Sequence, residues 1–296
     1  MNTSTKSKDT VVLLGHTGFL GRSIAGFLGE KGIPIRGSSS QTCNLLEISE
    51  VERLFAGIEE FKVIVSAGIT RRTDNSFEAM TRNLRMMHNL AEVLASRNPK
   101  GLIYLSSVDV YGQTPSLPIT EKTPAAPETL YGIGKLASEH LLRQPEKLTC
   151  PVTILRLPGV YGPGDQGQST LGRFYTQMRT RRKVTLYGNP KFRQDFLEVE
   201  ILCDVVWRLL QHPLHETINV VRGEGMTMSE WVELVARAAG LSPELAWDAP
   251  AHFANDLLFD ISYLRALFPD LSFAPLPQQI RRYVQSLEPL REASRG

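Results

Sequence analysis

The sequence predicts an α/β protein built on a doubly wound parallel sheet. Two observations support this fold class. Short apolar runs alternate with amphipathic segments along the first half of the chain, and a glycine-rich turn joins the first apolar run to the first amphipathic segment. Apolar strands that alternate with helices are typical of a parallel sheet covered on both faces. We therefore expect ligands at the carboxyl ends of the strands.

The elements of this alternation follow in order along the chain. The apolar run 11–14 predicts the first strand, and the helical spacing of Leu20, Ile24, Phe27 and Leu28 predicts the helix after it. Further strands are expected over 33–37, 61–68, 101–107 and 152–158, and further helices over 49–58, 83–96 and 131–142.

The second half of the chain is less regular. Thr227 and Glu230 have the spacing of a capping box and predict the start of a helix that runs to about 240. A loop is expected over 162–170, a helix over 171–180, and short strands over 184–188 and 216–221.

The length of 296 residues suits a main domain with a smaller lobe. We expect a dinucleotide-binding domain over 10–165, completed by parts of 195–222, and a mostly substrate-binding lobe over 166–296.

Composition favours a cytoplasmic protein that binds small molecules. With 33 basic and 31 acidic residues, the net charge of +2 gives no reason to expect nucleic acid or a membrane surface as partner. Cys43, Cys150 and Cys203 are far apart in sequence and are expected to be reduced. No apolar run approaches the roughly 20 residues that span a bilayer, and the polar start of the chain is not typical of a signal peptide.

The glycine turn predicts a phosphate site. Gly15, Gly18 and Gly21 lie between a strand and a helix, where unpaired backbone N–H groups and the helix dipole attract anions. We expect the bare backbone from 15 to 21 to make room for the diphosphate of a dinucleotide. The other residues expected to line it are Thr17, Phe19 and Leu20.

The end of the second strand bears on the choice of dinucleotide. An acidic residue there would bind the ribose 2′-hydroxyl of NAD, whereas the segment 33–42 carries Arg36, Ser38 and no carboxylate. Positive charge and hydroxyl donors favour the 2′-phosphate of NADP, with NAD still possible. The alternative is that Arg36 is a solvated residue at the strand end.

Tyr131 and Lys135 are candidate catalytic residues. Positions four apart share one helix face, so the ammonium can lie near the phenol. A nearby cation favours phenolate, so we expect the pKa of Tyr131 to be lowered toward the working range of a proton donor. Ser107 ends the strand that precedes this helix, where its hydroxyl could hold a substrate carbonyl.

These motifs together resemble the extended short-chain dehydrogenases of the nucleotide-sugar epimerase, dehydratase and reductase group. The resemblance runs from about residue 10 to about 225 and includes the glycine turn, Asn83, "SSVDVYG" at 106–112, Tyr131 with Lys135, and "RLPGVYGPG" at 156–164. It implies a Rossmann fold, with Tyr131 as acid/base, Lys135 as its partner and ribose ligand, and Ser107 as the group that orients the carbonyl. Further cofactor contacts implied by the resemblance are Asn44 and Leu45 near the adenine, Ala67 and Gly68, and Pro158 and Val160 on the nicotinamide side.

Within this group the sequence is most similar to the NADP-dependent 4-keto-deoxysugar reductases. Dehydratases of the group carry an Asp-Glu pair where this chain has Val108 and Asp109, which argues against dehydration. A 4-epimerase with the same three catalytic residues and a non-catalytic NADP sensor stay open as alternatives.

The resemblance also implies a nucleotide-sugar substrate. The residues expected at its mouth are Ile69, Thr70 and Asp109, with Arg193 one position before the place of the arginine that binds the nucleotide diphosphate in the family. No metal site is expected, because Pro213 separates His212 from His215 and breaks any helix there. A homodimer through the helices that flank the catalytic strand is expected by analogy.

Overall fold

The computed structural model describes residues 9–112, 117–144, 146–187, 191–248 and 256–288. The chain divides into two compact units, of which the first comprises Met1–Gly112, Pro127–Arg156 and Cys203–Ile218. The second comprises Gln113–Ala126, Leu157–Leu202 and Asn219–Gly296. We expected a boundary at 165 with completion by parts of 195–222; the chain enters the second unit over 113–126 and again at 157, and it returns to the first unit over 203–218.

The first unit contains a six-stranded sheet with the strand order β10-β5-β4-β3-β1-β2. The strands are β1 (Thr10–Leu14), β2 (Ile35–Ser38), β3 (Phe61–Val65), β4 (Leu102–Ser107), β5 (Val152–Leu157) and β10 (Thr217–Asn219). β1 pairs in parallel with both β2 and β3, and β3 pairs in parallel with β4. The order therefore reverses beside β1, which makes the carboxyl ends of β1 and β3 the expected ligand crevice. The predicted doubly wound fold is confirmed.

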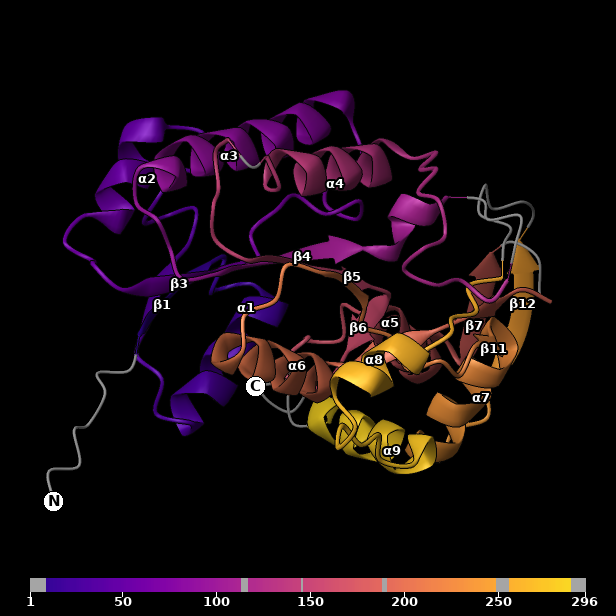
Figure 1. The fold of residues 1–296 in the computed structure, drawn as a ribbon. Helices are drawn as coiled ribbons and strands as arrows, with labels where there is room; N and C mark the ends of the chain where they lie inside the picture. The colour runs from indigo at the N-terminus through magenta and orange to yellow at the C-terminus, as the bar shows by residue number, and fades with distance from the viewer. Residues whose placement is uncertain (1–8, 113–116, 145, 188–190, 249–255, 289–296) are drawn as a thin grey trace, which may run out of the picture. The chain divides into compact units, whose positions relative to one another are not determined.

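Helices cover both faces of this sheet. α2, α3 and α4 lie on one face and α1 lies on the other (Figure 1). The bounds are α1 Phe19–Glu30, α2 Ile48–Phe55, α3 Phe77–Ala95, α4 Leu130–Leu141 and α6 Val199–Gln211, with a short 3₁₀ helix, η1, at Val108–Tyr111. α3 begins at Phe77, earlier than the predicted 83, because the Ser76 hydroxyl caps it by accepting from the Ala79 N–H.

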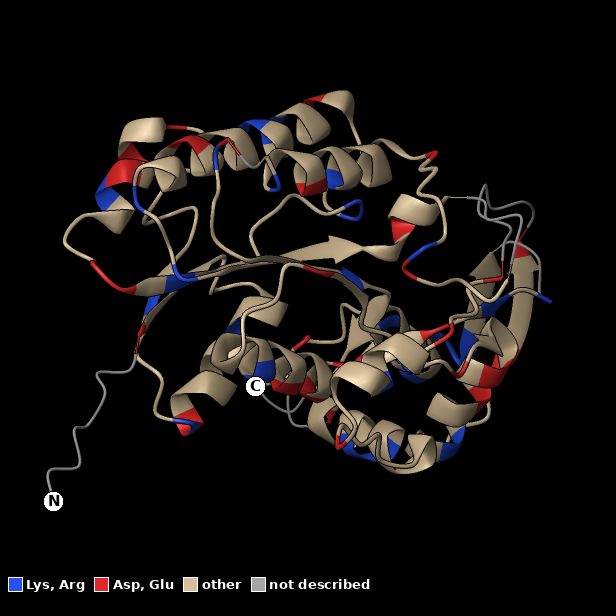
Figure 2. Cartoon of the chain, in the orientation of Figure 1, with Lys and Arg blue, Asp and Glu red and all other residues tan. Residues whose placement is uncertain are grey.

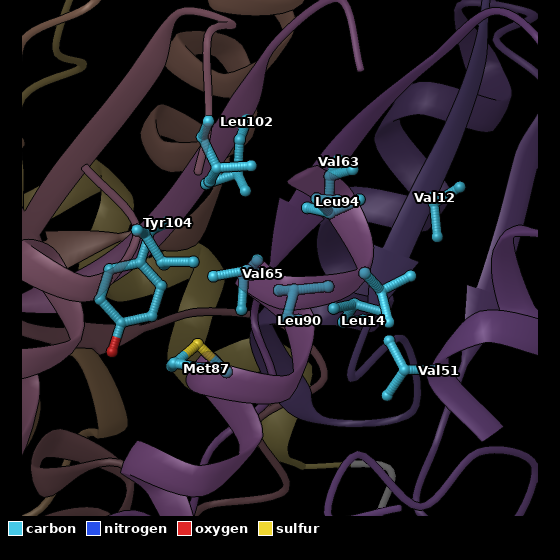
Figure 3. Close-up of a cluster of buried hydrophobic side chains, with 14 of the residues drawn as sticks. Val12, Leu14, Val51, Val63, Val65, Met87, Leu90, Leu94, Leu102 and Tyr104 are labelled. Carbon is cyan, nitrogen blue, oxygen red and sulfur yellow. The ribbon is translucent and has the colours of Figure 1, made fainter. Parts of the chain in front are cut away.

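One hydrophobic core lies between the sheet and the α2–α3 layer. Alternate residues of each strand point to this layer, such as Val12 and Leu14 in β1 and Val63 and Val65 in β3 (Figure 3). They pack against Leu90 and its neighbours in α3 and against α2. This packing fixes the positions of the strands relative to α2 and α3, and the candidate site lies at the carboxyl ends of these strands.

The second unit has its own core. Its helices are α5 (Thr170–Arg181), α7 (Met228–Ala239), α8 (Ser262–Leu267) and α9 (Leu276–Leu287). Its short strands pair as β6 (Gly159–Tyr161) with β9 (Phe196–Glu198), β7 (Lys183–Tyr187) with β12 (Glu244–Asp248), and β8 (Arg193–Gln194) with β11 (Met226–Thr227). α5, α7 and α9 pack around Trp231, and the predicted capping box of Thr227 and Glu230 is present.

The charged side chains carry both signs in close succession. α2, α3 and α4 each carry both basic and acidic residues (Figure 2). Among the described helices, none is long and apolar enough to cross a membrane.

Candidate active site

The turn between β1 and α1 needs two of its glycines for contacts with the protein's own backbone. Gly15 has a φ of +81°, and a Cβ there would lie 2.8 Å from the backbone of Ala67, just after β3. A Cβ on Gly21 would lie 2.1 Å from the Gly15 carbonyl oxygen. These two glycines allow α1 to start directly against the ends of β1 and β3.

Gly18 is different. The nearest atom to a Cβ at this position is the Gly15 carbonyl oxygen at 3.4 Å, which is an ordinary contact. Gly18 is exposed and is the N-cap of α1, where it offers no side chain to the N–H groups of the first turn. Gly15 and Gly21 therefore make room for the protein's own backbone, whereas Gly18, with Thr17, Phe19 and Leu20 beside it in the turn, has no close contact at its Cβ position. An open, uncapped helix start fits a diphosphate.

The end of β2 lies beside this turn. The Ser38 carbonyl accepts from the Gly15 N–H at 2.9 Å and from the His16 N–H at 3.1 Å. Arg36 instead donates to the Ala56 carbonyl at 3.1 Å, at the C-terminal end of α2. Because α2 runs back from the carboxyl edge of the sheet, this contact places the guanidinium toward the opposite edge, so binding a 2′-phosphate through Arg36 would require that bond to be exchanged.

Asn44 and Leu45, which we expect near the adenine of the cofactor, lie in the loop that follows β2. The Asn44 N–H donates to the Glu50 carboxylate at 2.7 Å, and the Leu45 carbonyl accepts from the Asn89 side chain at 3.0 Å. Asn44 is exposed, whereas Leu45 is part of the core. Two elements, α2 and α3, therefore fix this loop.

The sequence motifs did not single out His16. A Cβ on Gly37 would lie 2.5 Å from the His16 imidazole, so the ring packs against the bare backbone of β2. Its Nδ1 is buried without a hydrogen-bond partner among the described residues. The signal was present in the sequence as a glycine at 37, inside a strand, where it allows a close approach.

The segment after β3 is clamped by α3. Asn83 accepts from the Ile69 N–H at 2.8 Å and donates to the Ile69 carbonyl at 2.9 Å. A small pocket is lined by Ala67, Gly68, Asn83, Tyr104 and Lys135, among others. Ile69 is thus fixed through its backbone, and Thr70, one residue on, is exposed and bonded to Thr73 at 3.0 Å.

Tyr131 and Lys135 are brought together on α4, as their spacing predicted. The Thr129 hydroxyl caps the helix by accepting from the Gly132 N–H at 2.9 Å. The Lys135 Nζ lies 5.8 Å from the centre of the Tyr131 ring and donates to the Leu105 carbonyl of β4 at 2.7 Å. The phenol therefore starts the helix beside an ammonium group that β4 holds in place.

The expected lowering of the pKa of Tyr131 is not found. Burial raises the pKa of Tyr131 above its ordinary value of 10.0, while Lys135 pulls in the opposite direction and is outweighed. The physical reason is that the partly enclosed phenol loses more solvation as phenolate than the nearby ammonium returns. The Lys135 ammonium stabilises the phenolate form of Tyr131, but burial has the larger effect, so Tyr131 is protonated in this structure.

Ser107 and Asp109 lie at the end of β4. The buried Ser107 hydroxyl oxygen accepts from the Asp109 N–H at 3.1 Å and so caps η1, which leaves its hydrogen to be donated. Asp109 pairs with Arg71 at 3.1 Å. Burial raises the pKa of the Asp109 carboxyl, and Arg71 and Lys135 oppose this shift.

Three predicted residues lie in the second unit. Pro158 is buried just after β5, and Val160 is half-buried in β6. Arg193 lies in β8, where its guanidinium pairs with Asp256 at 3.0 Å and its backbone N–H donates to the same carboxylate at 2.7 Å. The ion pair with Asp256 could not be inferred from the motif.

The histidines near Pro213 are placed in the first unit. The His215 Nδ1 accepts from the Val152 N–H at 3.3 Å and thereby joins the loop before β10 to β5. Among the described residues, no group of three or more His, Cys, Asp or Glu side chains is arranged to hold a metal ion.

A model of the NAD dependent epimerase/dehydratase family matches residues 11–221. Two relatives illustrate the range of the similarity. A probable UDP-glucuronate 4-epimerase of Rhizobium meliloti is 26% identical over 236 residues, covering 69% of each chain. A probable GDP-L-fucose synthase 1 of Oryza sativa subsp. japonica is 25% identical over 263 residues, covering 81% of this chain and 80% of the relative.

Solved structures show the same fold. RMD from Pseudomonas aeruginosa, complexed with NADPH, has a TM-score of 0.83 at 24% identity and covers 95% of this chain and 98% of its own. The Thermus thermophilus UDP-glucose 4-epimerase in complex with NAD has a TM-score of 0.83 at 23% identity. The match covers 94% of this chain and 99% of the epimerase chain. With the family model matched over most of its length and the Tyr131–Lys135 pair at the end of its sheet, the chain belongs to the NAD-dependent epimerase/dehydratase family, the extended short-chain dehydrogenases.

Proposed function

We propose that the protein reduces the 4-keto group of a nucleotide-activated deoxysugar, with Tyr131 as the proton donor. The observation that carries this proposal is the convergence of Ser107, Tyr131 and Lys135 at the carboxyl end of β4. A buried hydroxyl with a hydrogen to donate, a protonated phenol and an ammonium group match the needs of a carbonyl that gains negative charge.

The cofactor in this proposal is NADPH, which supplies hydride when bound. Gly18 and the uncapped start of α1 would hold its diphosphate, and Ala67, Gly68 and Lys135 line the pocket at the ends of β3 and β4. The absence of a carboxylate over 33–42 favours the 2′-phosphate. The proposal places the 2′-phosphate at the serine-rich end of β2, near the exposed Ser40 beside Ser38, with Arg36 reaching it by exchanging its bond to Ala56.

The substrate would enter between the loop after β3 and η1. Thr70 is exposed, and Asp109 together with Arg71 presents one charge of each sign beside Tyr131. In the second unit, Arg193 would bind the nucleotide diphosphate by exchanging the Asp256 carboxylate for phosphate oxygens.

A 4-epimerase is the second candidate, favoured by the relative named a probable UDP-glucuronate 4-epimerase. The same three residues would serve, with the cofactor retained through the cycle.

A homodimer through α3 and α4 is also proposed, since Phe77 and Ile133 on these packed helices are 58% and 40% exposed. Light scattering of the purified chain should give twice the mass of 33.0 kDa.

Turnover separates the candidates. The purified protein is incubated with NADPH, or with NADH, and a panel of UDP-, GDP- and dTDP-linked sugars and their 4-keto derivatives. Consumption of NADPH with formation of a 4-hydroxy sugar supports the reductase. A new 4-isomer without net consumption identifies the epimerase, and cofactor binding without either product contradicts both enzymatic hypotheses and supports a sensor.

A further inference from the structure

A buried ion pair lies directly behind the proposed catalytic residues. Glu139 and Arg156 are 5% and 7% exposed. The Arg156 guanidinium donates twice to the Glu139 carboxylate, from Nε at 3.1 Å and from a terminal guanidinium nitrogen at 2.7 Å. Glu139 lies four residues after Lys135 and eight after Tyr131, which places all three on one face of α4.

The pair is connected to the end of β4. The Ser106 hydroxyl donates to the Glu139 carboxylate at 2.5 Å. On one side of Ser106, the Leu105 carbonyl accepts from the Lys135 ammonium, and on the other side Ser107 presents its own hydroxyl. Of these three consecutive residues of β4, Leu105 therefore binds Lys135, Ser106 binds Glu139, and Ser107 supplies the hydroxyl that the proposed function assigns to the substrate carbonyl.

The pair also supports η1. The Arg156 guanidinium lies 4.9 Å from the centre of the Tyr111 ring, which is fully buried. η1 follows Ser107 and carries Asp109, so Arg156 stacks under the segment that Ser107 caps. Arg143, one turn after Glu139, adds positive charge near this carboxylate and is itself bonded to Thr217 at 2.7 Å.

We propose that the Glu139–Arg156 pair positions the active site, by fixing the end of β4 and α4 in one register so that Ser107, Tyr131 and Lys135 meet. Packed apolar residues generally stabilise a fold as well as a buried ion pair does. What such residues lack is the directional contact to Ser106 and Tyr111. The role in turnover rests on the proposed function, whereas the role in placing Lys135 does not.

The test uses the double variant Glu139→Gln/Arg156→Met. Removing one partner alone would leave a buried charge unpaired and could unfold the chain, whereas the double variant removes one charge of each sign. We expect it to fold, with kcat reduced by about tenfold or more and KM for NADPH and sugar changed by less than about threefold, because positioning acts on the reaction step.

The matched control is Glu92→Gln/Lys147→Met. It removes an ion pair of 2.5 Å that joins α3 to the loop after α4, away from the strand ends. Its kcat should stay within about twofold of the wild type. If the control loses as much activity as the first variant, the effect is a general loss of packing and the proposal is wrong.

A second measurement needs no substrate. Crystal structures of the wild type and of the Glu139→Gln/Arg156→Met variant, grown under one condition, are compared at Lys135. The proposal predicts that the bond from Nζ to the Leu105 carbonyl is lost or that the Nζ moves away from the Tyr131 ring. Unchanged geometry would overturn it. If the wild type turns over no sugar, the proposed function fails while this comparison still decides the positioning role.

Discussion

The turn between β1 and α1 and the strand that carries Arg193 were both expected to bind phosphate, yet the protein constrains them very differently. In the turn, backbone atoms lie where side chains at Gly15 and Gly21 would be, so the residue type is set by the fold itself. Arg193 is a half-exposed side chain held by one carboxylate. Motifs enforced by backbone packing can therefore be interpreted from sequence with more detail than motifs that depend on a surface charge.

The largest effect should come from overfilling the turn. In Gly21→Ala the new Cβ meets a backbone oxygen that has no room to yield, so we expect a loss of about 3 kcal/mol in the free energy of unfolding. Gly26→Ala is the control in the same helix, since nothing lies within 4 Å of its Cβ position. In urea unfolding, Gly26→Ala should be at least as stable as the wild type. An equal loss of unfolding free energy in both variants would contradict the close packing at Gly21.

The next effect tests the buried neighbour of Arg193. Burial raises the pKa of Asp195 to about 6, against backbone N–H donors at Arg222 and Gly223. An acid whose pKa is raised by folding destabilises the fold as pH rises through the window between its unfolded and folded values. The difference in unfolding free energy between Asp195→Asn and the wild type should shift by about 2 kcal/mol in favour of the variant from pH 4 to pH 7. A constant difference would show that Asp195 is not buried as described.

A smaller effect isolates ligand binding in the turn. Gly18→Ala fits the structure without a clash, so its free energy of unfolding should fall by no more than about 1 kcal/mol, because alanine is a poorer N-cap residue than glycine. Its methyl group occupies the path to the helix start, and we expect NADPH to bind about tenfold more weakly, or about 1.4 kcal/mol. Fluorescence titration measures this, and unchanged affinity would remove the diphosphate from this turn.

The smallest effect is expected at the surface pair. Burial pushes the pKa of Asp256 upward, but the bonds from Arg193 outweigh it and hold the pKa below 3.8. Because the pair is partly exposed, Asp256→Asn should cost less than about 1 kcal/mol in thermal unfolding near neutral pH. The stabilisation should fade as pH falls through the folded pKa. A loss several times larger would mean that this region is as constrained as the glycine turn.

The sequence predicted the order of the strands and helices in the first unit because apolar periodicity and glycine turns are local signals. It also predicted that Tyr131 and Lys135 share a face, since helix geometry fixes that spacing. The ion pairs Glu139–Arg156 and Arg193–Asp256 join residues from separate elements, and their contacts depend on tertiary packing. The raised pKa of Tyr131 has the same origin, because its burial and the groups around it, Lys135, Tyr104 and Asp109, come from separate elements.

The most direct test of the central claim is the variant Tyr131→Phe, measured for turnover and for NADPH binding. If the phenol at the start of α4 is the proton donor, kcat should fall by about 10²- to 10⁴-fold while the Kd for NADPH stays within about threefold. A variant that retains most of the wild-type kcat would place the chemistry elsewhere in the molecule.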